Sequence, residues 1–254
     1  MSSTAVTAGG YEVHTGPTIH RAYDAVFQNL PLVIQFAWLP YLFVLAAEVL
    51  GVLIVGEGSD GQMLAWMLGG LGFIVFGTIF AVRWIRHLLL GEMPTAELFP
   101  PAWRPMFFAT VTIALLVFAG GIAIALLSMI LLPLAVLVWG GGAIAVALIA
   151  VRILPMLPSA AVEQPIDVRT AWEMMHGNYW HLVACALICY VPFALIDGVI
   201  SGSDDSLPWL VWLIMEAIRL AVSFLGLACL YAMLADVYQG MTGFGRRTVS
   251  GVAD

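Results

Sequence analysis

The fold is decided by residues 165–183, Pro165-Ile-Asp-Val-Arg-Thr-Ala-Trp-Glu-Met-Met-His-Gly-Asn-Tyr-Trp-His-Leu-Val183, where an amphipathic segment runs directly into an apolar one. Apolar residues recur in it at three- and four-residue spacing, which is typical of one face of a helix. They are Val168, Ala171, Trp172, Met175 and Tyr179. The pattern predicts a helix that lies in the headgroup layer of a membrane and leads into a membrane span.

A similar pattern lies 149 positions earlier, near the N-terminus. Its apolar stripe consists of Ile19, Ala22, Tyr23 and Val26. Residues of one kind also correspond at this offset further along, namely Asn29 with Asn178, Tyr41 with Tyr190, and Glu48 with Asp197. The chain is therefore predicted to begin the same unit twice, as an internal repeat.

The composition is that of a membrane protein. Of the 254 residues, 62% are hydrophobic and 10% are charged, and the mean hydropathy is +1.01. Both values lie far outside the usual range of soluble domains, so we expect an all-α protein that crosses a membrane several times. All nine basic residues are arginine and the formal net charge is -7. No segment carries a basic patch, so nucleic-acid binding is not expected.

Six segments have the roughly 20 mostly apolar residues that a membrane-spanning helix needs. They are residues 31–55, 62–82, 106–128, 134–154, 179–200 and 208–234. The third and fourth belong to one uncharged run that is too long for a single span, so a turn must interrupt it. Pro133 and the glycine run 140–142 are the two candidate positions, and Pro133 is preferred.

These spans predict one membrane domain, residues 18–239, between disordered tails at 1–17 and 240–254. The first tail lacks the basic start and apolar core of a signal peptide, so the first span is expected to act as the insertion signal.

Arginines are distributed unevenly between the two sides of this domain. Eight of the nine fall on one side, and the loops of the opposite side carry only acids. The positive-inside rule then places both termini in the cytoplasm. The spans would form three successive hairpins, each beginning with a cytoplasmic interfacial segment. Tyr23, Trp172 and Trp180 are the expected interfacial anchors, and Trp84 is assigned to the same aromatic belt.

The last span contains the two most costly residues of the membrane domain, Glu216 and Arg219. Each charge costs about 2.5–3.5 kcal/mol at the centre of a spanning helix, and their three-residue spacing allows them to pair. Glu48 and Asp197 lie at depths from which an arginine can be reached. A cluster of these four residues would be either a static contact between helices or a polar site on an ion or proton path.

Four possible metal ligands fall in the last two spans, namely His181, Cys185, Cys189 and Cys229. Imidazole and thiolate bind zinc and copper, but cysteine is also an ordinary packing residue in apolar surroundings. No Cys-x-x-Cys spacing occurs, so we predict free thiols, no metal and no cofactor. Nucleotide-binding loops and hydrolase motifs are also missing from the sequence, so an enzyme is not expected.

Three short runs carry a family resemblance, namely Leu157-Pro-Ser-Ala-Ala-Val-Glu163, Ala171-Trp172 and Gly177-Asn-Tyr-Trp-His-Leu182. They resemble the bacterial six-span proteins related to the membrane domain of glycerophosphoryl diester phosphodiesterases. The chain departs from that pattern at Gln164 and Ala171, where family members often have Gly and Ser. The resemblance implies a six-span fold in the bacterial inner membrane and carries over no catalytic residue.

We therefore expect a non-enzymatic inner-membrane protein that acts as a scaffold or accessory subunit. Its partners would be the lipid bilayer and another membrane protein or a second copy of the chain. The alternative is a small transporter or lipid-handling protein that uses the charged cluster. Pro40 and Pro192 point to this alternative, because they fall within one turn of each other at the repeat offset and paired helix breaks mark binding sites in transporters.

Overall fold

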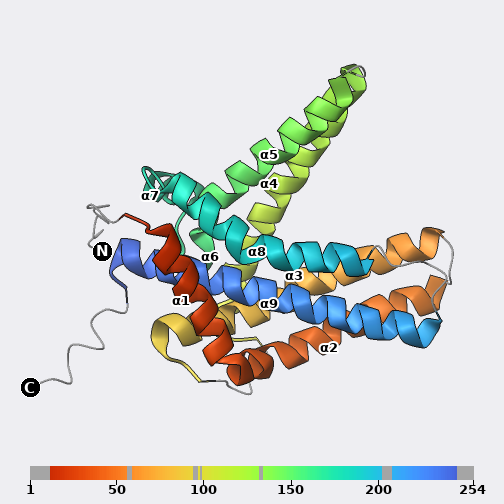
Figure 1. Ribbon diagram of the computed structural model, residues 1–254, viewed down its shortest axis with the longest axis horizontal. Helices are drawn as coiled ribbons and strands as arrows, with labels where there is room; N and C mark the ends of the chain where they lie inside the picture. Colours follow the sequence, from red (N-terminus) through yellow and green to blue (C-terminus); the bar gives the residue numbers. More distant parts are fainter. Residues whose placement is uncertain are drawn as a thin grey trace, which may run out of the picture.

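The structure, a computed structural model, describes residues 12–55, 59–93, 97, 99–131, 134–201 and 208–244 (Figure 1). These residues form nine helices and no strands, which confirms the predicted all-α class. The helices are α1 (Thr15–Gln28), α2 (Leu30–Val55), α3 (Ser59–Leu90), α4 (Trp103–Ile130), α5 (Ala135–Ile153), α6 (Met156–Ala161), α7 (Val168–Met174), α8 (Tyr179–Ser201) and α9 (Trp209–Thr242).

Six of the helices in this described part of the chain are long and apolar enough to cross a membrane, which makes the chain a multi-pass membrane protein. They are α2, α3, α4, α5, α8 and α9, at the positions that hydropathy predicts. α3 runs on to Leu90, past the predicted end at residue 82. The arginines after residue 82 do not end the helix: Arg86 pairs with Glu92 and Glu163, and Arg83 donates to the Glu97 backbone carbonyl.

Helical structure also extends beyond the predicted limits of the membrane domain. α1 begins at Thr15, and the Val13 side chain before it is 1% exposed. The Val13 backbone N–H donates to Asn178 Oδ1 at 2.8 Å, which ties this segment to the start of α8. At the other end α9 continues to Thr242. The rest of the two predicted tails, residues 1–11 and 245–254, lies outside the described residues.

The turn between the third and fourth spans lies between Ile130 and Ala135, where α4 ends and α5 begins. Pro133 itself is outside the described residues. The competing glycine run, residues 140–142, is inside α5, so that alternative is wrong. Glycine serves packing here, because a Cβ at Gly142 would lie 2.6 Å from Ile124 Cγ1 of α4.

Five helices form most of the body of the molecule: α1, α2, α3, α8 and α9. α3 and α9 meet in its core through Phe80 and Phe224, whose rings are 5.5 Å apart. Trp84 is fully buried there and donates its indole N–H to the Ala228 carbonyl at 3.0 Å. Its assignment to the aromatic belt is therefore wrong, because the buried backbone acceptor satisfies the one polar group that would favour an interface.

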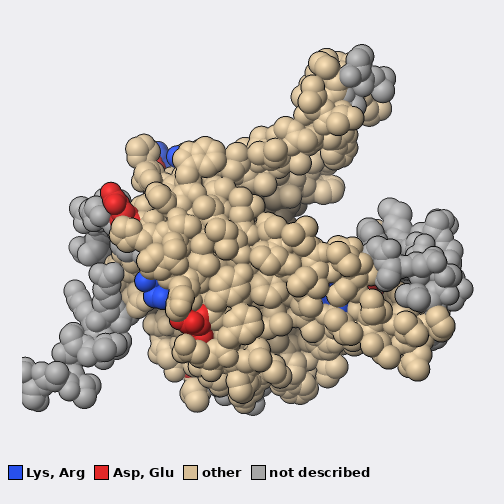
Figure 2. Space-filling view, in the orientation of Figure 1, with Lys and Arg blue, Asp and Glu red and all other residues tan. Residues whose placement is uncertain are grey.

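α4 and α5 form an arm that projects away from this body (Figure 1). The two helices contact each other along their length, whereas α4 meets α3 and α6, and α5 meets α7 and α8. Among the described residues, α4 has four that are buried, Met106, Ala109, Ile124 and Ser128, and α5 has one, Ile153, whereas 61% of the spanning part of α9 is buried. Figure 2 shows the arm standing clear of the body, with uncharged residues over its visible surface.

The segment 165–183 is broken, not continuous. α7 is seven residues long, and Asp167 caps it by accepting the Thr170 backbone N–H at 2.8 Å. Gly177 has φ +89°, a left-handed conformation that interrupts the helical path. α8 then begins at Tyr179, so the apolar stripe read from Val168 to Tyr179 belongs to two helices.

Candidate functional site

The structure brings the four predicted charged residues together around the Arg219 guanidinium. Its Nε donates to Glu216 Oε1 at 2.8 Å, one turn earlier on α9. Nη1 lies 3.4 Å from Asp197 Oδ1 of α8, and Nη2 lies 3.3 Å from Glu48 Oε1 of α2. Nη2 also pairs with Glu216. The cluster thus joins three spanning helices, which we call the Arg219 cluster below.

The Arg219 cluster is mostly withdrawn from the surface. Its side chains range from 14% exposed for Glu216 to 29% for Asp197. Interactions between charges are stronger in such a low-dielectric setting than in water, and an unpaired charge is correspondingly costly. The sequence signal that located the cluster was this cost, since Glu216 and Arg219 stand in an otherwise apolar helix.

Two residues of the site were not expected from the sequence. Ser223, one turn after Arg219, lies with its Oγ 2.9 Å from Asp197 Oδ1, to which it can donate. Gly69 of α3 provides the room for Glu48, because a Cβ at Gly69 would lie 2.6 Å from Glu48 Cγ. The four-residue spacing from Arg219 could have identified Ser223. A single sequence holds no signal that would identify Gly69.

The charges of the Arg219 cluster do not balance. Three carboxylates and one guanidinium meet there, so the ionised cluster has a formal net charge of -2. Glu48 Oε2 is buried with no hydrogen-bond partner. Protonation of one carboxyl group would halve this net charge. The arrangement is therefore suited to holding a proton as well as to linking helices.

The four candidate metal ligands do not converge. His181 Nδ1 lies 3.1 Å from Thr15 Oγ1, and Cys185 Sγ lies 3.9 Å from the Thr15 carbonyl oxygen. Cys189 and Cys229 are buried free thiols. Within the described ranges, no group of three or more His, Cys, Asp or Glu side chains is placed to hold a metal ion.

The three predicted anchors have different surroundings. Tyr23 packs inward and donates its hydroxyl to the Ile188 carbonyl of α8 at 2.9 Å, so α1 lies against the body along this face. Trp172 is 38% exposed and lies under the Arg152 guanidinium, 4.0 Å from the ring centre. Trp180 is 67% exposed. Only the two tryptophans therefore present large apolar rings at the surface.

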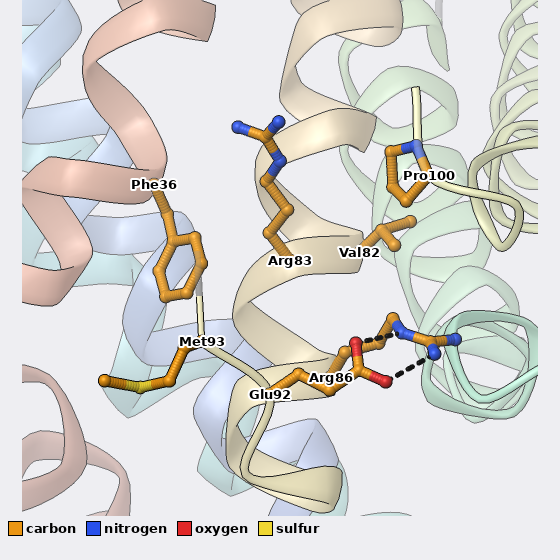
Figure 3. Close-up of a pocket in the computed structure, with 7 residues that line it drawn as sticks. All are labelled: Phe36, Val82, Arg83, Arg86, Glu92, Met93 and Pro100. Atoms are coloured by element: carbon orange, nitrogen blue, oxygen red, sulfur yellow. Dashed lines mark hydrogen bonds and ion pairs between the residues drawn. The ribbon is translucent and has the colours of Figure 1, made fainter. Parts of the chain in front are cut away.

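A small cavity lies where α2 and α3 meet the loop that follows α3 (Figure 3). Its volume is about 30 Å³, which is room for about two water molecules. Arg86 pairs with Glu92 at its edge, at 2.5 Å. In Figure 3 the Arg83 guanidinium points away from that pair, and it donates to the Glu97 carbonyl. The cavity is too small for an organic substrate.

Comparisons of the chain with protein-family models, curated proteins and solved structures found no match. The resemblance to the phosphodiesterase-related membrane proteins stays a prediction from residues 155–185. Function must therefore be argued from the geometry alone.

Proposed function

We propose that the chain is a non-enzymatic scaffold or accessory subunit of the bacterial inner membrane, which binds another membrane protein through the α4–α5 arm. The arm is the observation that carries this proposal. α4 meets the body through α3 and α6, and α5 through α7 and α8, and only Met106, Ala109 and Ile153 among the described residues of the two helices belong to the body's core. An apolar hairpin of this kind offers two long faces to a partner inside the bilayer.

The glycines of the arm support a protein partner over lipid. Gly120 and Gly142 are occupied by the arm's own packing, where an added Cβ would meet Val146 and Ile124. Gly121, Gly140 and Gly141 have no neighbouring atom within 4 Å of such a Cβ. Small residues let the backbones of two membrane helices approach closely, so these open positions suit a helix of another membrane protein.

The finer architecture belongs to the same proposal. α2 with α3, α4 with α5 and α8 with α9 would be three hairpins, with α1 and α7 as amphipathic elements on the cytoplasmic face and both termini in the cytoplasm. The contacts within each pair support it. Asn29 and Asn178 each precede a span, and the backbone carbonyl oxygen of each accepts a first-turn N–H at 3.0 Å, from Val33 and Leu182, which is compatible with the repeat.

The test is purification of the tagged protein from native membrane in polymer discs, followed by mass spectrometry of everything recovered. A photo-crosslinking residue at position 141 should join the arm to one protein partner. Gly141→Leu should reduce recovery of that partner at least about tenfold. Gly70→Leu, at an equally open glycine on α3, is the matched control. A protein recovered alone, or a partner retained equally by both variants, would refute the proposal.

A small transporter is the second candidate, and the unbalanced charge of the Arg219 cluster favours it. A site with a net charge of -2 and a buried oxygen without a partner can take up and release a proton. Reconstituted vesicles with a pH-sensitive dye inside test this directly. Proton movement that is lost in Glu48→Gln and kept in Glu173→Gln, an exposed acid of α7, would support it. Vesicles no leakier than protein-free ones would count against it.

A further inference from the structure

Arg152, in the last turn of α5, is held between aromatic rings. Its guanidinium carbon lies 4.0 Å from the centre of the Trp172 ring and 5.3 Å from that of Tyr179. The Tyr179 hydroxyl is fixed in turn by donating to the Leu148 carbonyl at 3.0 Å. Stacking on aromatic faces stabilises a guanidinium without satisfying its N–H donors. Arg152 is therefore held in place with hydrogen-bonding capacity left over.

Four other arginines in the described part of the chain have carboxylate partners, whereas Arg83 donates to the Glu97 backbone carbonyl. Arg21 pairs with Asp236 at 2.8 Å, Arg86 with Glu92 and Glu163, Arg169 with Glu173 at 2.9 Å, and Arg219 with its three acids. Arg152 forms no ion pair with any described carboxylate, and its Nε is buried with no hydrogen-bond partner. The acids of the adjacent α7 are engaged, since Glu173 pairs with Arg169 and Asp167 caps the helix. The Nη groups of Arg152 are then the donors that an external anion would meet.

The position of Arg152 specifies what kind of anion can reach it. α5 meets α7 and α8, and beyond these contacts the arm diverges from the body and leaves open space (Figure 2). Both helices have exposed apolar side chains, such as Ile149 at 47% on α5 and Leu187 at 54% on α8. Within a bilayer, acyl chains fill such a space. Tryptophan and tyrosine are typical of the headgroup level, so a lipid in this space would have its phosphate beside Arg152.

We propose that Arg152, stacked on Trp172 and Tyr179, binds the phosphate of an anionic phospholipid whose acyl chains lie between α5 and α8. The guanidinium offers parallel N–H donors that match two phosphate oxygens. Basic pockets between membrane helices are known headgroup sites. The site goes beyond the scaffold role, because it holds whether or not the arm binds a protein.

The test is native mass spectrometry of the delipidated full chain, titrated in detergent with phosphatidylglycerol and, separately, with phosphatidylcholine. Wild type should bind one phosphatidylglycerol at least about tenfold more tightly than phosphatidylcholine. Arg152→Gln should lose at least about fivefold in phosphatidylglycerol affinity. Arg169→Gln removes the same charge from a nearby exposed ion pair and should stay within about twofold of wild type.

Equal phosphatidylglycerol affinity in wild type and Arg152→Gln would overturn the proposal. Should Arg152→Gln fail to fold, Arg152→Lys decides, because lysine keeps the charge and loses the planar fork. A loss of about threefold or more in that variant supports the site, and an unchanged affinity overturns it. Inorganic phosphate is the remaining probe: if it displaces the lipid at equal concentration, the site binds free phosphate and the lipid assignment is wrong.

Discussion

Gly69 of α3 faces Glu48 of α2 so closely that a Cβ on Gly69 would stand 2.6 Å from Glu48 Cγ and 2.9 Å from its Oε1. The absence of a side chain at Gly69 thus determines where the Glu48 side chain can lie. It lets the carboxyl group reach across to Arg219 on a third helix, and any side chain at position 69 must displace either Glu48 or the backbone.

Gly69→Ala should therefore destabilise the protein by about 1–3 kcal/mol, the usual cost of overpacking. The reason is that the displaced carboxylate loses its contact with Arg219. Thermal unfolding in detergent, followed by intrinsic fluorescence, measures the effect. Gly70→Ala is the adjacent control, because no atom lies within 4 Å of its Cβ position. Equal melting temperatures for the two variants would contradict this packing.

Arg219→Leu should lower the unfolding free energy by about 3 kcal/mol. Ordinary hydrogen bonds between membrane helices contribute only about 0.6 kcal/mol each. Removing Arg219 leaves three carboxylates without their cation, which lowers the unfolding free energy far more. Because Arg219 is 25% exposed, the loss should lie at the lower end of the range for breaking a buried ion pair. Yield of folded protein and melting temperature are the measurements. Arg169→Leu, which breaks an exposed pair, should change the melting temperature by at most about a degree or two.

Trp84→Phe should cost about 1–3 kcal/mol, because it removes a buried N–H donor from the Ala228 carbonyl and leaves unfilled space between α3 and α9. Chemical denaturation monitored by circular dichroism gives the value. Trp180→Phe is the matched substitution at a ring that is 67% exposed, and it should be nearly neutral. Similar costs at both positions would mean that Trp84 is not in the core.

The α7 cap should depend on pH. The Thr170 hydrogen bonds to Asp167 lower the pKa of this carboxyl below its usual range. A group whose folded pKa is lowered stabilises the fold above its unfolded pKa, near 4, and this contribution is lost as the pH falls through the folded value. Hydrogen exchange at the Thr170 amide should accordingly accelerate below about pH 4, relative to amides of α8. In the Asp167→Ala variant, the Thr170 amide should exchange rapidly at every pH. An exchange rate equal to that of the wild type would contradict the cap.

Hydropathy located the spans because the cost of insertion is counted residue by residue along the chain. The same reasoning found Glu216 and Arg219. The free-energy cost of placing them in a span predicted that acids from other helices would lie near Arg219. It could not reveal how helices are arranged in the plane of the membrane, since an apolar face is equally compatible with lipid and with protein. The projecting arm of α4 and α5 is therefore invisible in the sequence.

Local breaks were harder to predict than spans. The apolar spacing from Val168 to Tyr179 suits one helix, but Gly177 adopts a left-handed conformation and divides it. The position of Trp84 near the predicted end of a span suggested an interface, yet the buried Ala228 carbonyl gives its indole a partner inside the protein. In each case a tertiary contact or a single backbone angle outweighed a correct local pattern.

The ion pair between Arg21 and Asp236 joins residues that are 215 positions apart. Synthesis proceeds from the N-terminus, so α1 leaves the ribosome long before α9 exists to receive it. The five spans α2, α3, α4, α5 and α8 are synthesised between α1 and α9, so α1 has no contact with α9 during that time. α1 can contact α8 earlier, through Tyr23, but it gains its ion pair with Asp236 only after α9 has been made.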